Sequence, residues 1–173
     1  MVQAVIEVNS MVNTLKLWWA RLSPFPCGKW LFSKLVGFLI PYTGSISPII
    51  LQCRPGFAEV MIKDGRRLRN HLGSLHALAL ANLGEFTTGL AIHFAMQRNT
   101  RAILTHLSCD FVKKARGTIT ASAAVELSER HEEGPVVVEA KLFDPQKNLV
   151  AKVSATWLLA PQGRENLVGI SRN

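Results

Sequence analysis

The sequence has 173 residues, of which 48% are hydrophobic and 18% are charged. This composition is typical of one globular domain and excludes a disordered, coiled-coil or collagen-like protein. The 20 Lys and Arg residues against 12 Asp and Glu give a net charge of +8. This charge favours an anionic ligand or surface, and it leaves nucleic acid, a membrane and a phosphate-bearing small molecule as alternatives.

The cysteines and the N-terminus bear on where the protein works. The three cysteines are widely spaced and form no C-x-x-C pair, so they predict neither a disulfide framework nor a zinc site. The N-terminus has no basic residue before Lys16 and no small-residue cleavage site, so we expect no secretory signal. Polar residues interrupt the long apolar stretches, and we expect no membrane-spanning helix. These features predict a cytoplasmic protein.

The first part of the chain has helical periodicity. Apolar residues recur at helical spacing from about Val8 to Ile40, with a break at residues 23–26, where Ser-Pro-Phe-Pro stands. This pattern predicts two amphipathic helices in an N-terminal segment, residues 1–44. Basic residues lie among the large apolar ones. The helices could therefore pack on their own domain, which is the commoner case, or rest on a membrane surface.

A predicted hairpin and a long helix follow. Strand-like patterns run from Ile46 to Arg54 and from Phe57 to Asp64, with Pro55-Gly56 as the turn between them. After residue 76 comes a segment of mostly Ala and Leu that is apolar around its whole circumference. A helix with this pattern is expected to be buried on every side.

The last part of the chain alternates between apolar and polar residues. Four such segments, at about 102–112, 118–128, 136–142 and 149–157, predict strands joined as three successive hairpins. Residues 45–160 are therefore predicted to form an α+β domain in which a curved antiparallel sheet wraps around one helix. A second copy would cover the rest of that helix, which predicts a dimer. The polar residues 161–173 are predicted to form a loose tail.

Glu85 is the most unusual residue, because it lies in the middle of the apolar helix. Burial without a partner raises the pKa of a carboxyl group, and such groups cluster at functional sites. The alternative is that Glu85 reaches solvent at a subunit boundary or pairs with Arg98 or Arg101. His76 and Glu85 are expected on opposite sides of the helix, about 13 Å apart along it, so a site that uses both is shared between two subunits.

The start of this helix is a second candidate site. Free N–H groups around Ser74 to Ala77 form a positive terminus that can hold an oxyanion or polarise a carbonyl. Asn70 lies just before it and could donate a side-chain hydrogen bond to the same place. A role for Asn70 in a turn or cap fits the sequence equally well.

These residues carry a resemblance to a known family. The segment 70–76, Asn-His-Leu-Gly-Ser-Leu-His, with Glu85 fifteen positions after Asn70, resembles the signature of hotdog-fold acyl-CoA thioesterases of the phenylacetate-pathway type. The resemblance extends over about residues 45–160. The chain is most similar to a branch described mainly as a domain of unknown function. The resemblance implies a hotdog fold and a homodimer, or a dimer of dimers, with its sites at the subunit interface.

The resemblance also implies a role for each matching residue. Asn70 and the N–H of Ala77 would polarise the thioester carbonyl, and Glu85 of the partner subunit would act as general base or nucleophile. Gly73 belongs to the signature, and His76 would brace the loop. The family usually has His-Gly-Gly at 76–78 and Asp at 85, whereas this chain has His-Ala-Leu and Glu. No cofactor is implied, and coenzyme A enters only as part of the substrate. The alternative is an acyl or lipid carrier without turnover.

Two groups of basic residues flank this signature. They are candidates for binding the phosphates of coenzyme A, because the second group occupies the hairpin that, by resemblance, lies near the coenzyme A entrance. The alternative is that both groups are solvated turns. The residues are Arg66, Arg67 and Arg69, then Lys113, Lys114 and Arg116. No nucleic-acid fingerprint and no histidine pair with metal-ligand spacing is present in the sequence.

Overall fold

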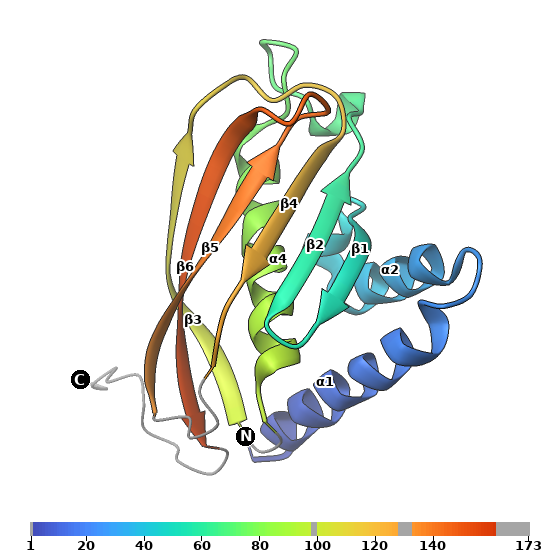
Figure 1. Ribbon diagram of the computed structural model, residues 1–173, viewed down its shortest axis with the longest axis vertical. Helices are drawn as coiled ribbons and strands as arrows, with labels where there is room; N and C mark the ends of the chain where they lie inside the picture. The colour runs from blue at the N-terminus through green and yellow to red at the C-terminus, as the bar shows by residue number, and fades with distance from the viewer. Residues whose placement is uncertain (1, 98–99, 128–132, 162–173) are drawn as a thin grey trace.

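The computed structural model describes residues 2–97, 100–127 and 133–161 (Figure 1). The predicted helices, the first hairpin and the four later strands all form, close to their expected positions. The elements are α1 (Val2–Leu22), α2 (Gly28–Leu39), α3 (Pro41–Gly44), β1 (Ile49–Arg54), β2 (Phe57–Ile62), η1 (Arg66–Leu68), α4 (Ala77–Ala95), β3 (Thr100–Phe111), β4 (Ile119–Ala124), β5 (Gly134–Phe143) and β6 (Leu149–Pro161).

The six strands form one antiparallel sheet in the order β1-β2-β4-β5-β6-β3. Helix α4 lies along one face of this sheet, and α1 and α2 lie toward its β1 side (Figure 1). Most of α4 is buried. This arrangement is the α+β domain that the sequence predicts, with one sheet packed around a long apolar helix.

The prediction of three successive hairpins is wrong at the first of them. Strand β3 pairs with β6 at one edge of the sheet, from Thr100 opposite Pro161 to Phe111 opposite Ala151. Strand β4 pairs instead with β2 and β5. Alternating polarity identifies a strand and its buried face, but it carries no information about which strand lies beside it.

Two glycines allow α4 to lie very close to the sheet. A Cβ added to Gly84 would lie 2.4 Å from the Cβ of Val153. At Gly89 the added atom would lie 3.3 Å from the ring of Trp157, whose Nε1 donates a hydrogen bond of 3.2 Å to Oγ1 of Thr88. The helix therefore depends on small residues where it crosses β6.

Replacing Gly84 with Ala should lower the free energy of unfolding by about 1–2 kcal/mol. Overpacking a core costs about 1–3 kcal/mol, and the better helix propensity of Ala recovers up to about 1 kcal/mol. Urea unfolding measures the difference. Gly65→Ala is the matched control, because Gly65 has an extended backbone and open space around it. A Gly84→Ala variant as stable as the unchanged protein would contradict this packing.

The N-terminal helices share the core of the domain. Nε1 of Trp19 on α1 donates a buried hydrogen bond of 2.8 Å to the carbonyl of Cys53 on β1. On α2, Oγ of Ser33 accepts a hydrogen bond of 2.8 Å from the backbone N–H of Ile50. The buried side chains of Trp19 and Phe32 pack edge to face, 5.2 Å between ring centroids. These contacts are those of helices packed on their own domain.

Two further expectations concern the ends of the chain. Among the described residues, no helix has both the length and the apolar character needed to cross a membrane. The predicted tail, residues 161–173, lies outside the described residues except for Pro161, the last residue of β6.

Candidate functional site

The loop between η1 and α4 folds back on itself. The backbone N–H of Asn70 donates to the carbonyl of Ser74 at 2.8 Å, and that of Gly73 donates to the carbonyl of Asn70 at 3.1 Å. Gly73 has a φ of +68°, a conformation that glycine adopts without strain. The N–H of Leu75 donates to the carbonyl of Ala115 at 2.9 Å. The loop is therefore fixed to the segment that follows β3.

The amide oxygen of Asn70 accepts hydrogen bonds within the loop, whereas its amide nitrogen is available as a donor. Its Oδ1 accepts hydrogen bonds from the N–H of Leu72 at 2.9 Å and from the N–H and Oγ of Ser74 at 3.3 and 3.2 Å. Because a backbone N–H can only donate, this atom must be the amide oxygen. Within the described residues the amide nitrogen has no acceptor. Asn70 thus holds the turn and still has an N–H₂ group to offer.

The first turn of α4 leaves one backbone donor open. His76 is the N-cap residue, and its Nδ1 accepts a hydrogen bond of 3.1 Å from the N–H of Leu78. Its carbonyl accepts hydrogen bonds from Ala79 and Leu80. In the part of the chain that the structure describes, only the N–H of Ala77 in this turn has no acceptor. The helix dipole makes this donor a place for a developing negative charge.

The residues that carry these groups line a cleft of about 300 Å³ between the loop and the segment after β3. Asn70 and Ala77 line it from one side, and Phe111, Lys113 and Lys114 line it from the other. The structure thus brings together the predicted carbonyl-polarising groups and two of the six basic residues.

Arg69 is engaged within the protein. Its Nε and one terminal nitrogen donate to the two carboxylate oxygens of Asp64, at 2.8 and 3.1 Å. Asp64 also accepts a hydrogen bond of 3.0 Å from the N–H of Gly117. The hydrogen bond from Arg69 is the main cause that holds the pKa of Asp64 below its usual range. Asp64 therefore ties Arg69 to the segment before β4, and the charge of Arg69 is paired within the protein.

Lys113 also has an acidic partner. Its Nζ lies 3.2 Å from Oδ2 of Asp144, whose side chain is nearly inaccessible to solvent. Hydrogen bonds from Asn148 contribute most, and Lys113 less, to lowering the pKa of Asp144 to about 2. Lys113 thus lines the cleft with a partly neutralised charge.

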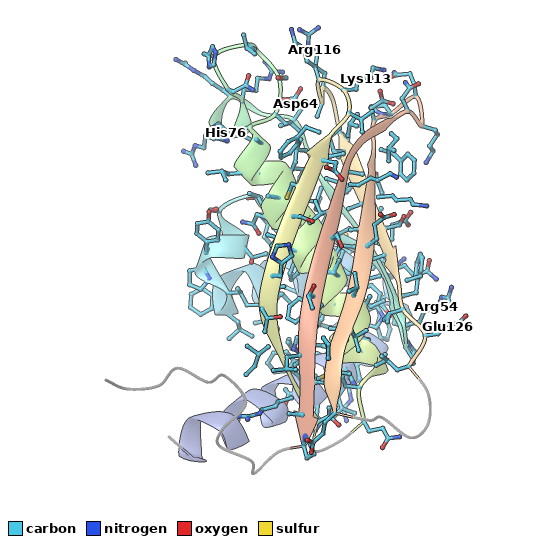
Figure 2. The ribbon with its side chains drawn as sticks, turned by 90° about the vertical axis from the view of Figure 1, so that its left-hand side faces the viewer. Arg54, Asp64, His76, Lys113, Arg116 and Glu126 are labelled. Carbon is cyan, nitrogen blue, oxygen red and sulfur yellow. The ribbon has the colours of Figure 1, made fainter. Side chains whose placement is uncertain are left out.

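The other four basic candidates, Arg66, Arg67, Lys114 and Arg116, are exposed. No salt bridge involves them among the residues that the structure describes. Figure 2 shows Arg116, Lys113, Asp64 and His76 at the same end of the molecule. This end combines the helix start with a concentration of positive charge.

Glu85 lies elsewhere, at a cavity of about 160 Å³ between α4 and the N-terminal helices. Its side chain is partly buried, and burial raises the pKa of its carboxyl group above the usual range. No salt bridge joins it to Arg101, and Arg98 lies outside the described residues. The residues lining the cavity are Val12, Leu15, Val36, Ile40, Thr43, Glu85, Phe86, Gly89, Leu90, His93, Phe94 and Trp157.

One subunit therefore keeps the two parts of the predicted site apart. Ala77 and Glu85 are eight residues apart on α4, which corresponds to about 12 Å along the helix axis. They line two different hollows. This separation agrees with the expectation that one chain cannot bring both groups to one reacting carbonyl.

The sequence did not predict the cavity or several of the residues that line it. His93 lies on the same side of α4 as Glu85, two turns further along, and its ring packs edge to face on Trp157 at 5.5 Å. Burial lowers the pKa of His93, so it is neutral near pH 7. The spacing of positions 85, 89 and 93 indicates one stripe of the helix. Nothing in the sequence indicates that Val36 of α2 and Ile40, which follows α2, face this stripe.

Solved structures share this fold. The protein APC5556 superposes with a TM-score of 0.75 and 26% identity, over 88% of this chain and 98% of its own. PA5026 of Pseudomonas aeruginosa, described as a probable thioesterase, superposes with a TM-score of 0.66 and 22% identity, over 79% of this chain and 97% of its own. The thioesterase HI1161 of Haemophilus influenzae superposes with a TM-score of 0.63 and 13% identity, over 73% of this chain and 87% of its own. The fold is the hotdog fold that the sequence signature predicts.

Sequence comparisons point to the same group. No curated protein matches this chain. The family described as domain of unknown function DUF4442 matches residues 28–159, which includes α2, the loop before α4 and nearly the whole sheet. The match spans most of the chain and agrees with the predicted branch of the superfamily, so the protein belongs to the DUF4442 family of hotdog-fold proteins.

Proposed function

We propose that the protein hydrolyses acyl thioesters of coenzyme A at a site shared between two copies of the chain. The observation that carries this proposal is Glu85, a partly buried carboxylate on an apolar cavity without a cation to pair with among the described residues. A carboxylate with a raised pKa is a competent base near neutral pH. It removes a proton from water as the hydroxide oxygen adds to the carbonyl carbon. The tetrahedral intermediate then collapses, the carbon–sulfur bond breaks, and the proton held by Glu85 passes to the departing thiolate to give the free thiol.

The helix start supports the second half of this chemistry. The tetrahedral intermediate carries a negative oxygen, which needs donors placed in advance. The Asn70 amide nitrogen and the Ala77 N–H face one cleft and have no acceptor in the described part of the chain. They supply two such donors.

The free edge of β3 supports a second copy. Strand β3 has 12 residues, and no other strand of the described chain pairs with its outer edge. Ile103, Leu107 and Phe111 on this strand are exposed. A long edge with exposed apolar side chains is a template for pairing with another strand. Two-fold pairing of β3 with its own copy would lay the two α4 helices side by side in opposite directions.

The substrate class follows from the two hollows. Arg116 lies at the helix-start end (Figure 2), and Lys114 lines the cleft there. Arg66 and Arg67 belong to η1, whose Leu68 carbonyl accepts a hydrogen bond from the N–H of His76. These four exposed cations therefore lie where the phosphates of coenzyme A need positive charge. The cavity at Glu85 is lined mostly by apolar side chains and suits the acyl group. Of the solved structures with this fold, HI1161 is called a thioesterase and PA5026 a probable thioesterase.

A carrier without turnover is the second candidate, and Leu78 favours it. Its side chain is 63% exposed in the first turn of α4, where the family that the signature resembles has glycine. A leucine there narrows the approach of a thioester carbonyl to the Ala77 N–H. A carrier would copurify with lipid or acyl-CoA and release no thiol.

Thiol release from a panel of acyl-CoA substrates separates the two candidates. The enzyme should release free thiol from at least one acyl chain length, as detected with a thiol-reactive dye. The absence of release from every member of the panel, together with copurified lipid, would leave the carrier as the function.

The pH dependence should follow the carboxyl group of Glu85. Because burial raises its pKa, the base is protonated and inactive over a wider acidic range than an exposed Glu, whose pKa is about 4.3. In the pH profile of kcat/KM, the midpoint of the acid limb should therefore lie above the pKa of an exposed Glu. Glu85→Asp should keep such a limb, with a changed midpoint. A midpoint at or below the ordinary Glu value would contradict the role of Glu85 as base.

A bulkier residue at Ile40 should shorten the acyl chain that the enzyme accepts. Ile40 lines the cavity beside Glu85, so Ile40→Trp should lower kcat/KM for the longest accepted chain by about tenfold or more and leave acetyl-CoA nearly unchanged. Leu39→Trp is the control, because Leu39 is exposed and outside the cavity. Equal effects of the two variants on all chain lengths would place the acyl group elsewhere.

A further inference from the structure

Most of α1 and the whole of α2 and α3 belong to a long stretch of sequence without negative charge. Between Glu7 and Glu59 the chain has no acidic residue, and it has five basic ones, Lys16, Arg21, Lys29, Lys34 and Arg54. Arg21, Lys29, Lys34 and Arg54 are exposed. Residues 8–58 thus contribute five positive charges and no negative one to the net charge of +8, and they contain α2, α3 and most of α1.

Helix α2 exposes large apolar side chains on the side that faces away from the domain. Its buried side holds Phe32, Ser33 and Val36. At about 100° per residue, Trp30, Leu31, Lys34 and Phe38 fall within an arc of about 100° on the opposite side. We call these four residues the aromatic face. Trp30, Leu31 and Phe38 are each more than half exposed, and Phe38 reaches 81%.

The segments at both ends of α2 continue this composition. Phe25, in the turn before it, and Tyr42, on α3 after it, are also strongly exposed. Lys34 extends over the ring of Trp30, with Nζ 5.8 Å from the ring centroid. An exposed apolar patch that is mixed with basic side chains marks an interaction site, and Trp, Tyr and Lys together are typical of a membrane interface.

The proposed pairing of two copies does not cover this face. Helix α2 packs beside β1, and β1 and β3 are the two opposite edges of the sheet (Figure 1). Strand pairing through β3 therefore leaves the aromatic face open to solvent. An occupant with negative charge and an apolar layer fits it better than a second copy of this basic chain, because like charges repel.

We propose that the aromatic face docks the protein on an anionic lipid surface. Lys34 contacts the lipid phosphates and carboxylates, while Trp30, Leu31 and Phe38 insert at the level of the headgroups. Val36, on the buried side of α2, lines the cavity at Glu85. Docking therefore holds the predicted acyl site within one helix diameter of the bilayer.

Vesicle flotation of the full chain tests this surface. The probes are vesicles of phosphatidylcholine alone and of phosphatidylcholine with phosphatidylserine. Binding should require phosphatidylserine and weaken as salt is added. Phe38→Ser and Lys34→Glu should each lower the partition coefficient by about tenfold or more. The first variant removes an inserted apolar side chain, and the second reverses a charge at the surface.

Two matched controls carry the same changes on another part of the surface. Val137→Ser removes an apolar side chain that is 64% exposed on β5, and Lys141→Glu reverses an exposed charge on the same strand. Both controls should float like the unchanged protein. Size-exclusion chromatography should give one oligomeric state for all five proteins.

Three flotation results would overturn the proposal. They are no flotation of the unchanged protein, equal binding to the uncharged vesicles, and equal losses in the control variants. A change in oligomeric state with Phe38→Ser would assign the face to a second copy instead. Phe38 and Lys34 lie outside the cavity, so hydrolysis of dissolved acyl-CoA should be the same in all variants. The flotation result therefore stands apart from the test of catalysis.

Discussion

Replacing Glu85 with Gln should lower kcat for thiol release by about 100-fold to 10,000-fold, the usual contribution of a general base, and by more if Glu85 is the nucleophile. Gln has nearly the same shape but cannot accept a proton at neutral pH. KM should change much less, since the cavity keeps its lining. Steady-state kinetics on the best substrate of the acyl-CoA panel measures both constants.

The same variant separates a catalytic role from a structural one. Burial raises the pKa of Glu85 in the folded protein. The unfolded chain releases this proton at a lower pH, so the ionisation of Glu85 destabilises the fold as pH rises above the unfolded value of about 4.3. Glu85→Gln should therefore be as stable as the unchanged protein at pH 4 and equally or more stable at pH 8. A lower melting temperature at pH 8 would indicate a structural role for the carboxylate.

Asn70→Asp should lower kcat by about 100-fold to 1,000-fold, as expected for the loss of one donor to an oxyanion. Asp keeps the oxygen that accepts hydrogen bonds from Leu72 and Ser74, so the loop should keep its conformation. It replaces the amide N–H₂ with a second oxygen, which repels the negative charge of the intermediate. Kinetics and circular dichroism of the variant together measure the two effects.

Asn70→Ala is the informative companion to this variant. It removes both the turn-forming oxygen and the donor, so it should lose activity and also lower the melting temperature. If Asn70 served only the turn, Asn70→Asp would retain activity and only Asn70→Ala would lose it. That result would contradict the role of Asn70 in polarising the carbonyl.

The sequence predicts the elements of this fold better than their arrangement. The switch from helical to alternating periodicity after residue 100 identifies all four later strands, and it assigns the buried faces of β4, β5 and β6 correctly. The position of β3 at the far edge, beside β6, could not be predicted this way. Pairing depends on contacts between segments that are distant in sequence, and alternation within one strand does not record them.

The site shows the same division between local and distant information. The separate positions of Asn70, the helix start and Glu85 follow from spacing along one helix and its preceding loop. The pairing of Arg69 with Asp64 and of Lys113 with Asp144 does not, because sequence alone shows only two clusters of basic residues. The cavity wall from α2 was likewise unpredictable, since it depends on how Trp19 and Ser33 fix two helices to β1.

The most direct test of the shared site is to mix the two inactive variants. If Asn70 of one subunit works with Glu85 of the other, a heterodimer of Glu85→Gln and Asn70→Asp subunits contains one intact site and one doubly altered site. Refolding an equal mixture should then restore about a quarter of the activity of the unchanged protein. If each subunit holds a complete site of its own, the mixture stays as inactive as its components, and that result would contradict the account.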